Sequence, residues 1–146
     1  MIRVLIVDAD FYRDLAAEMV RGAMAELDAR GISYDRVSVP GALEIPTAIS
    51  IASKRIDGPP YEGYVALGCV IRGETSHYDI VCGESARGLA ELALTRDLAI
   101  GNGILTVDNS DQAWARAGVH GNGKNKGKDA VVACLSLMDL KVRYRV

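Results

Sequence analysis

Hydrophobic and polar positions follow two rhythms along this chain. Short apolar runs at residues 3–7 and 64–71 are typical of buried strands, and a similar run at 99–107 is broken by Gly101 and Gly103. Val37 and Val39 alternate with polar neighbours in a further candidate strand. Between these segments, apolar residues recur at the spacing of a helix. The pattern therefore predicts strands and helices in alternation.

Three of the expected helices are marked by clear boundaries. The first ends near Gly31, and the second begins at Pro46, whose missing N–H is not needed in a first turn, and runs toward Arg55. A third, short helix is capped within 108–110 and runs through Ala117. The inward face of the first helix is expected to carry Leu15, Met19, Ala23 and Leu27.

Two longer helices are expected at about 77–95 and 129–140, the latter after a loop at 118–127 rich in glycine, asparagine and lysine. Their inward residues are predicted to be Ile80, Val81, Leu89, Leu92 and Ala93 in the former, and Val131, Leu135 and Met138 in the latter. Strands spaced by helices favour a parallel sheet covered on both faces. With no repeat and no linker, the sequence predicts a single α/β domain over residues 1–146.

Composition and charge exclude several classes of function. The net charge of −2 leaves no basic surplus for binding nucleic acid, and no apolar run approaches the roughly 20 residues that span a bilayer. Cys69, Cys82 and Cys134 are widely spaced, which indicates reduced, buried thiols, and two histidines argue against a zinc site. The first residues lack the pattern of a secretory signal. We therefore expect a cytoplasmic protein without a metal.

Three loops lie where the chemistry is expected. Ligands of open parallel sheets bind beyond the carboxyl ends of the strands, and the loops at 8–12, 40–44 and 72–77 all follow predicted strands. The third loop leads into a helix, whose unpaired N–H groups and dipole favour an anion. His77 stands at its end, and histidine has an ordinary pKa near 6.5. This turn can therefore hold a phosphate and supply a proton beside it.

The segment 4–10 also resembles the start of a phosphorylatable receiver domain, which holds Mg²⁺ with acidic residues after its first strand and phosphorylates an aspartate after its third. Here the run at 64–71 is followed by Arg72 and Gly73, and no acidic residue stands at its tip. We therefore reject that interpretation and assign Asp8 and Asp10 to a solvated loop or helix cap.

Five segments in register resemble the lumazine synthase family of riboflavin biosynthesis. They are Val39-Pro40-Gly41-Ala42-Leu43-Glu44-Ile45-Pro46, residues 67–79, Gly103-Ile104-Leu105-Thr106, Gln112-Ala113-Trp114-Ala115-Arg116-Ala117-Gly118 and Asn125-Lys126-Gly127. Together they cover most of the chain, in the family's order and spacing. The resemblance implies a three-layer α/β/α sandwich with a mostly parallel central sheet, flavodoxin-like, assembled as a ring.

The resemblance also implies a reaction. The family joins 5-amino-6-(D-ribitylamino)uracil to 3,4-dihydroxy-2-butanone 4-phosphate, releases phosphate and water, and makes 6,7-dimethyl-8-ribityllumazine, which passes to riboflavin synthase. No metal or organic cofactor takes part. The alternative is a non-catalytic paralogue that binds a lumazine or flavin. The presence of His77 and Arg116 favours the enzyme, because such a binder has no need to recognise a phosphate.

The resemblance assigns one group of residues to the pyrimidine and its ribityl chain. Phe11 matches an aromatic that stacks on the pyrimidine, and Glu44 matches a carboxylate that accepts hydrogen bonds from the sugar hydroxyls. The same group includes Ala42 and Leu43 beside the ribityl chain, and the backbone of Cys69, Val70 and Ile71 at the pyrimidine edge. Simpler interpretations are a packing role for Phe11, dipole stabilisation for Glu44 and a core position for the Cys69 thiol. We prefer the simpler interpretation for the Cys69 side chain only.

A second group is assigned to the phosphate and the proton. Glu74 and Thr75 match the phosphate cradle, and Arg116 matches an arginine that a neighbouring subunit contributes, whose planar fork suits a phosphate. His77 matches the proposed proton donor, a role that typically contributes about 10²–10⁴-fold in rate. The simpler interpretations are a solvated arginine and a structural histidine.

Lys126 and Asn102 match two more residues that reach the substrate from a neighbour. Asn102 stands where many members have an apolar or aromatic residue, Ala115 replaces a common glutamate, and residues 10–12 replace Arg-Phe-Asn, departures that bear on affinity. Because family sites lie between subunits, we expect a pentameric ring, with a face-to-face decamer as the alternative. The loop at 119–124 looks longer than in capsid-forming members, which argues against a capsid.

Overall fold

A computed structural model describes residues 3–118 and 124–146 and confirms the three-layer α/β architecture. The described strands form one sheet in the order β2-β1-β3-β4, and every pairing is parallel. They are β1 (Val4–Ala9), β2 (Tyr34–Val39), β3 (Gly63–Ile71) and β4 (Ile100–Val107). The fold is therefore the flavodoxin-like sandwich that the sequence predicts.

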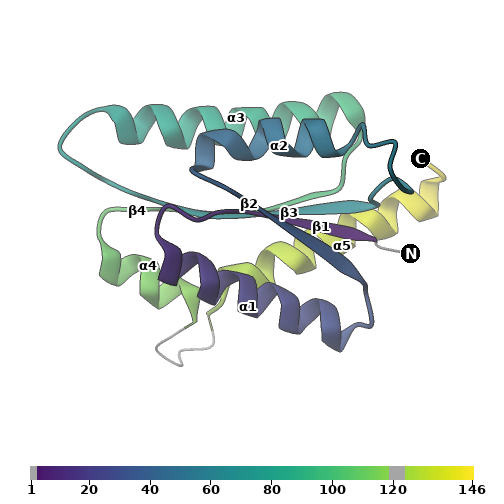
Figure 1. Ribbon diagram of the computed structural model, residues 1–146, viewed down its shortest axis with the longest axis horizontal. Coiled ribbons are helices and arrows are strands. Elements are labelled where there is room, and N and C mark those ends of the chain that lie inside the picture. The colour runs from purple at the N-terminus through teal and green to yellow at the C-terminus, as the bar shows by residue number, and fades with distance from the viewer. Residues whose placement is uncertain (1–2, 119–123) are drawn as a thin grey trace.

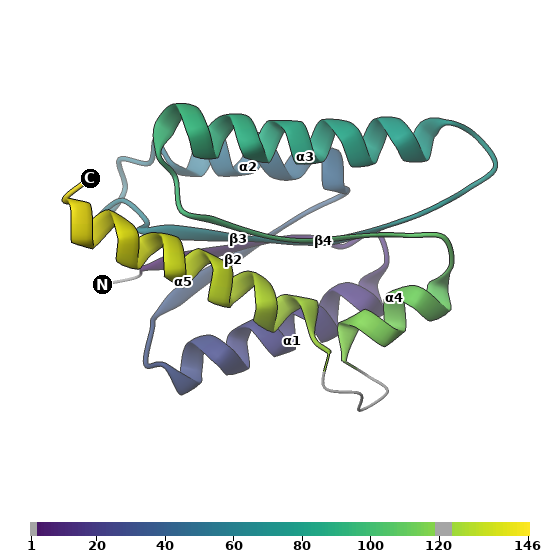
Figure 2. The same ribbon diagram turned by 180° about the vertical axis from the view of Figure 1, so that it is seen from behind.

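The helices cover the sheet on both faces (Figure 1). One face carries α2 (Ile45–Ala52), preceded by a 3₁₀ turn at Ala42–Glu44, and α3 (His77–Arg96). The other face carries α1 (Arg13–Ala29), α4 (Ser110–Ala117) and α5 (Lys126–Tyr144). Figure 2 shows the same layers from behind, where α5 crosses the sheet on the side of β4. No described helix has the length and apolar character needed to cross a membrane.

Two apolar layers hold the sandwich together, one on each side of the sheet. The predicted inward residues of α1 are at most 4% exposed, and those of α5 are likewise buried. Gly101 lets α5 approach β4 closely, because a Cβ there would collide with the backbone carbonyl of Ala130. The glycines that interrupt the apolar run at 99–107 therefore serve packing, and the strand is continuous.

Local signals set the ends of the helices. Gly31 adopts a φ of 67° just after α1, as its predicted stop requires. The side chain of Asn109 accepts a 2.9 Å hydrogen bond from the amide of Gln112, which confirms the cap within 108–110. The helix α5 begins at Lys126, three residues before its predicted start, because Asn125 caps it through a 3.1 Å bond from the amide of Lys128. Most of the loop predicted at 119–124 lies outside the described residues.

Three sequence-based predictions were wrong. Asp8 belongs to neither a loop nor a cap: it lies in β1, is 0% exposed, and accepts hydrogen bonds from Arg36 Nε at 2.9 Å and Ser38 Oγ at 3.0 Å. Ile80 is 55% exposed, because the buried stripe of α3 passes through Val81 instead. Of the three free thiols, only that of Cys134 is fully buried, and the other two are half-buried.

Candidate active site

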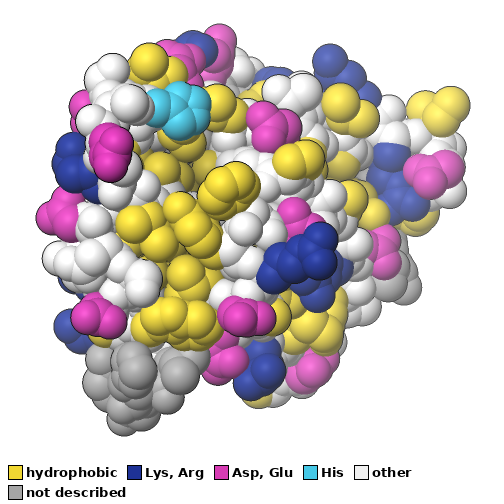
Figure 3. Space-filling model, turned by 60° about the vertical axis from the view of Figure 1, so that its left-hand side comes forward, with side chains coloured by type: hydrophobic (Ala, Val, Ile, Leu, Met, Phe, Trp, Pro, Cys, Tyr) yellow, Lys and Arg dark blue, Asp and Glu magenta, His cyan; other side chains and the backbone are white. Residues whose placement is uncertain are grey.

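The three loops predicted to converge do meet at the carboxyl edge of the sheet. They enclose a cavity of about 330 Å³. Its lining comprises Phe11, Tyr12, Gly41, Ala42, Leu43, Glu44, Cys69, Val70, Ile71, Gly73, Thr75, His77, Tyr78 and Val81. Figure 3 shows this side of the molecule, where apolar side chains gather in a hollow with a histidine, in cyan, above them. The parallel topology brings these distant segments together.

An aromatic pair forms one wall of the cavity. Phe11 precedes α1 and is 74% exposed, an unusual exposure for a phenylalanine that only packs a helix. The ring of Tyr12 packs nearly perpendicular to it, with centroids 4.9 Å apart and planes at 83°. Burial, and then the neighbouring Cys69, raises the pKa of the Tyr12 hydroxyl. An exposed ring held by a second, half-buried ring makes a platform for a flat ligand.

The end of β3 offers backbone groups to the cavity. The pairing of β1 with β3 stops at Leu67, whereas β4 pairs with β3 as far as Ile71. Within the described residues, the side of Cys69–Ile71 that faces β1 therefore has no strand partner. Such N–H and C=O groups can pair with the polar edge of a heterocycle. Burial, and then the neighbouring Cys82, raises the pKa of the Cys69 thiol to about 11, which favours the protonated, less nucleophilic form at neutral pH.

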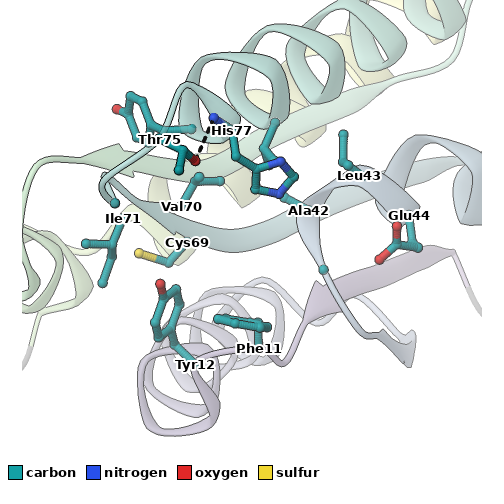
Figure 4. Close-up of a pocket in the computed structure, with 14 residues that line it drawn as sticks. Phe11, Tyr12, Ala42, Leu43, Glu44, Cys69, Val70, Ile71, Thr75 and His77 are labelled. Atoms are coloured by element: carbon teal, nitrogen blue, oxygen red, sulfur yellow. Dashed lines mark hydrogen bonds between the residues drawn. The ribbon is translucent and has the colours of Figure 1, made fainter.

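The loop after β3 has the character of an anion site. Gly73 and Thr75 line the cavity, and the side chain of Ser76, the N-cap residue of α3, makes no capping hydrogen bond. The hydroxyl of Thr75 accepts a 3.3 Å hydrogen bond from the backbone amide of His77. Figure 4 shows the imidazole of His77 directed into the space between the loop and Ala42. The positive end of the helix dipole, a hydroxyl and a titratable ring therefore share one rim.

The 3₁₀ turn supplies another wall of the cavity. Ala42 is 6% exposed and anchors the turn in the core, while Leu43 and Glu44 are exposed beside the cavity. Glu44 also stands directly before α2, so it is favoured there by the helix dipole as well. The two interpretations of Glu44 are thus compatible.

Four predicted site residues lie outside this cavity. Arg116 and Lys126 line a second hollow of about 370 Å³ beside β4, which is an edge strand of the sheet. Its lining residues are Ile104, Leu105, Thr106, Arg116, Lys124, Lys126 and Asp129. Asn102 is exposed on β4 and lines neither hollow, and Glu74 is exposed in the loop before α3.

Several lining residues were not predicted from the sequence. Val81 follows His77 by one helical turn, so helical spacing alone would place both on one face. Tyr78 was also missed; its ring is covered by the guanidinium of Arg72, 4.2 Å from the ring centroid. Tyr12 belongs to the loop predicted at 8–12 but was given no role in the site, and its contact with Phe11 depends on ring orientation that no sequence pattern reveals.

The fold and cavity define an α/β sandwich protein with a cavity of small-molecule size at the carboxyl edge of a parallel sheet. A profile of the family described as 6,7-dimethyl-8-ribityllumazine synthase matches residues 1–142. The chain belongs to this family.

Individual relatives are similar over nearly their whole length. A 6,7-dimethyl-8-ribityllumazine synthase of Afipia carboxidovorans is 55% identical over 141 residues, which cover 95% of this chain and 85% of the relative. The 6,7-dimethyl-8-ribityllumazine synthase 1 of Rhizobium meliloti is 54% identical, and the match covers 97% of this chain and 93% of the relative. The 6,7-dimethyl-8-ribityllumazine synthase of Azorhizobium caulinodans is 56% identical, and the match covers 97% of this chain and 87% of the relative.

Proposed function

We propose that this chain condenses 5-amino-6-(D-ribitylamino)uracil with 3,4-dihydroxy-2-butanone 4-phosphate to 6,7-dimethyl-8-ribityllumazine, with release of phosphate and water. The observation that carries the proposal is one cavity that combines an aromatic platform, a strand edge without a partner, an anion turn and a histidine. The family membership supplies the identity of the substrates.

The pyrimidine lies on Phe11 in this proposal. Its polar edge pairs with the backbone of Cys69–Ile71, and its ribityl hydroxyls reach the 3₁₀ turn, where Glu44 accepts hydrogen bonds. The exposure of the Phe11 ring and the pairing of β3 beyond the end of β1 support this orientation. Ala42 and Leu43 contribute the apolar surface next to the sugar chain.

The phosphate of the second substrate lies in the loop at 73–76, where it is held by Thr75 and by backbone amides beside Glu74. The reaction requires imine formation, loss of phosphate and ring closure, and each step moves protons between nitrogen, oxygen and carbon. His77 acts as the general acid or base, a role for which its position between this loop and Ala42 is suited. A further large share of the rate comes from holding two substrates in register.

A neighbouring subunit completes the site. Its hollow beside β4 brings Arg116 and Lys126 toward the phosphate and the pyrimidine, and Asn102 covers the ring. The cationic character of this hollow and its separate lining support a joint between two different surfaces. A joint between two different surfaces can close into a ring. The resemblance to the family makes that ring a pentamer, with a face-to-face decamer as the alternative. The enzyme works in the cytoplasm and passes its product to riboflavin synthase.

The test is to incubate the purified protein with both substrates. We expect the fluorescent lumazine to appear together with one phosphate per product. Tight binding of the product or of a flavin without turnover would instead indicate a non-catalytic paralogue and contradict the proposal.

A further inference from the structure

Arg72 follows β3 directly, and its side chain contacts three residues from two other segments. Its Nε lies 2.9 Å from Oδ1 of Asp108, just beyond β4, and its Nη1 lies 3.9 Å from Oδ1 of Asp79 in the first turn of α3. Its guanidinium also covers the ring of Tyr78, which lines the cavity. Arg72 thus joins the end of β4 and the start of α3 to the cavity wall.

The loop at 73–76 is exposed along its whole length. On its β3 side, the backbone amide of Arg72 donates a 2.9 Å hydrogen bond to the carbonyl of Val107. The side chain of Arg72 then reaches Asp108, the next residue along from Val107. Backbone and side chain together fix the origin of the loop against the end of β4.

The positive charge of Arg72 also affects the electrostatics of the loop at 73–76. Glu74, Asp79 and Asp108 are exposed carboxylates in or beside the segments that surround this loop. Each of them raises the free energy of a dianion bound nearby, since like charges repel. Arg72 pairs with two of the three, so it offsets the repulsion at the place where the phosphate is proposed to bind.

We infer that Arg72 is a positioning residue for the phosphate-bearing substrate: it neutralises Asp79 and Asp108 and holds the phosphate loop and Tyr78 in place. This inference rests on the proposed function of the loop at 73–76. Arg72 itself need not touch the phosphate.

The alternative is a surface ion pair with a merely structural role. The side chains of Arg72, Asp79 and Asp108 are 50%, 69% and 62% exposed, and pairs as exposed as these contribute little to stability. Loss of Arg72 should therefore leave the fold intact. A change in the KM of one substrate alone would then report on the charge around the loop at 73–76.

The experiment compares Arg72→Ala, Arg72→Lys, Asp108→Asn and the double variant Arg72→Ala/Asp108→Asn. The matched control is Arg87→Ala, an arginine of α3 that pairs with Glu84 and Glu91 on the same helix and lies outside the cavity lining. The measurements are kcat, the KM of each substrate, and inhibition by inorganic phosphate.

We expect Arg72→Ala to raise the KM of the phosphate substrate roughly fivefold, the scale of one charge interaction through water at about 4 Å, and to weaken inhibition by inorganic phosphate in parallel. The KM of the pyrimidine stays nearly unchanged. Adding Asp108→Asn to Arg72→Ala returns the KM of the phosphate substrate most of the way to the wild-type value, because the unpaired carboxylate is removed. The KM of Arg72→Lys lies between those of wild type and Arg72→Ala. Arg87→Ala behaves as wild type.

Equal changes in both KM values, or no recovery in the double variant, would overturn this inference. A wild-type protein that makes no lumazine would instead contradict the proposed function, so the two failures are distinguishable.

Discussion

The ring of Tyr12 packs nearly perpendicular to the ring of Phe11, with 4.9 Å between their centroids and 83° between their planes. Tyr12 is half-buried and packs against the core, whereas Phe11 is 74% exposed beside the cavity. The contact orients the Phe11 ring and leaves most of its side chain exposed. The face of Phe11 is thereby available to a planar substrate.

Phe11→Ala should raise the KM of the pyrimidine roughly threefold to tenfold, the usual range for loss of one aromatic pair. The KM of the phosphate substrate should change little, and the melting temperature should also change little because Phe11 is exposed. Steady-state kinetics with each substrate varied in turn, together with a thermal melt, checks this. A large loss of stability would indicate instead that Phe11 mainly packs against the protein.

Arg116→Ala should weaken the phosphate substrate far more than the pyrimidine, because a charge-assisted bidentate contact is lost on one side only. Arg21→Ala is a suitable control, since Arg21 is an exposed arginine of α1 that pairs with Glu18 on the same helix. The KM values of both substrates, measured for each variant, test whether the effect is specific to the phosphate substrate. Equal increases for both substrates would count against the proposed role of Arg116.

His77→Ala should slow kcat by no more than about 10²–10⁴-fold, since only proton transfer is removed while the orienting cavity remains. Rapid-mixing or long-time assays with both substrates at saturation measure this loss. Complete inactivity in a folded variant would show a larger role for the histidine. Unchanged turnover would leave His77 with a structural role alone.

The thiol of Cys69 should resist alkylation in the native protein. Burial raises its pKa from about 9 to about 11, so the native state holds the proton more tightly than the unfolded state. This group therefore favours folding below pH 9, and its contribution is lost as the pH rises from about 9 to about 11. Iodoacetamide labelling with peptide mapping should show slow reaction at neutral pH and a steep rise above about pH 9. Rapid native labelling at neutral pH would contradict this.

Much of the fold follows from periodicity, because α1 and α5 each bury one regular stripe and the central strands are apolar at nearly every position. The exposure of Ile80 was not predicted in this way, because α3 buries only a narrow stripe through Val81, Ser85 and Leu89. The burial of Asp8 was not predicted either, because its partners Arg36 and Ser38 come from β2, about thirty residues away. A buried carboxylate with distant partners cannot be recognised from its neighbours in sequence.

The cavity was predictable because parallel topology brings strand ends to one edge. Its finer features were not, since the overhang of β3 beyond β1 and the contact of Tyr12 with Phe11 depend on register and ring orientation. Arg116 and Lys126 lie at a separate hollow within the single subunit. Their role stays a prediction, because it requires a second copy of the chain.

A complementation experiment tests the central claim, a lumazine synthase whose site is shared between adjacent subunits. One chain carries Phe11→Ala and His77→Ala, which impair the cavity, and the other carries Arg116→Ala and Lys126→Ala, which impair the hollow. The two are co-expressed, their mixed oligomers are isolated by two different tags, and lumazine formation is compared with that of wild type and of each parent.

In a random ring, a cavity is intact in half of the subunits and its neighbour's hollow is intact in half, so about a quarter of the sites should be restored. We predict close to that fraction of wild-type activity, well above either parent. Mixed oligomers that are no more active than their parents, beside an active wild type, would contradict a shared site.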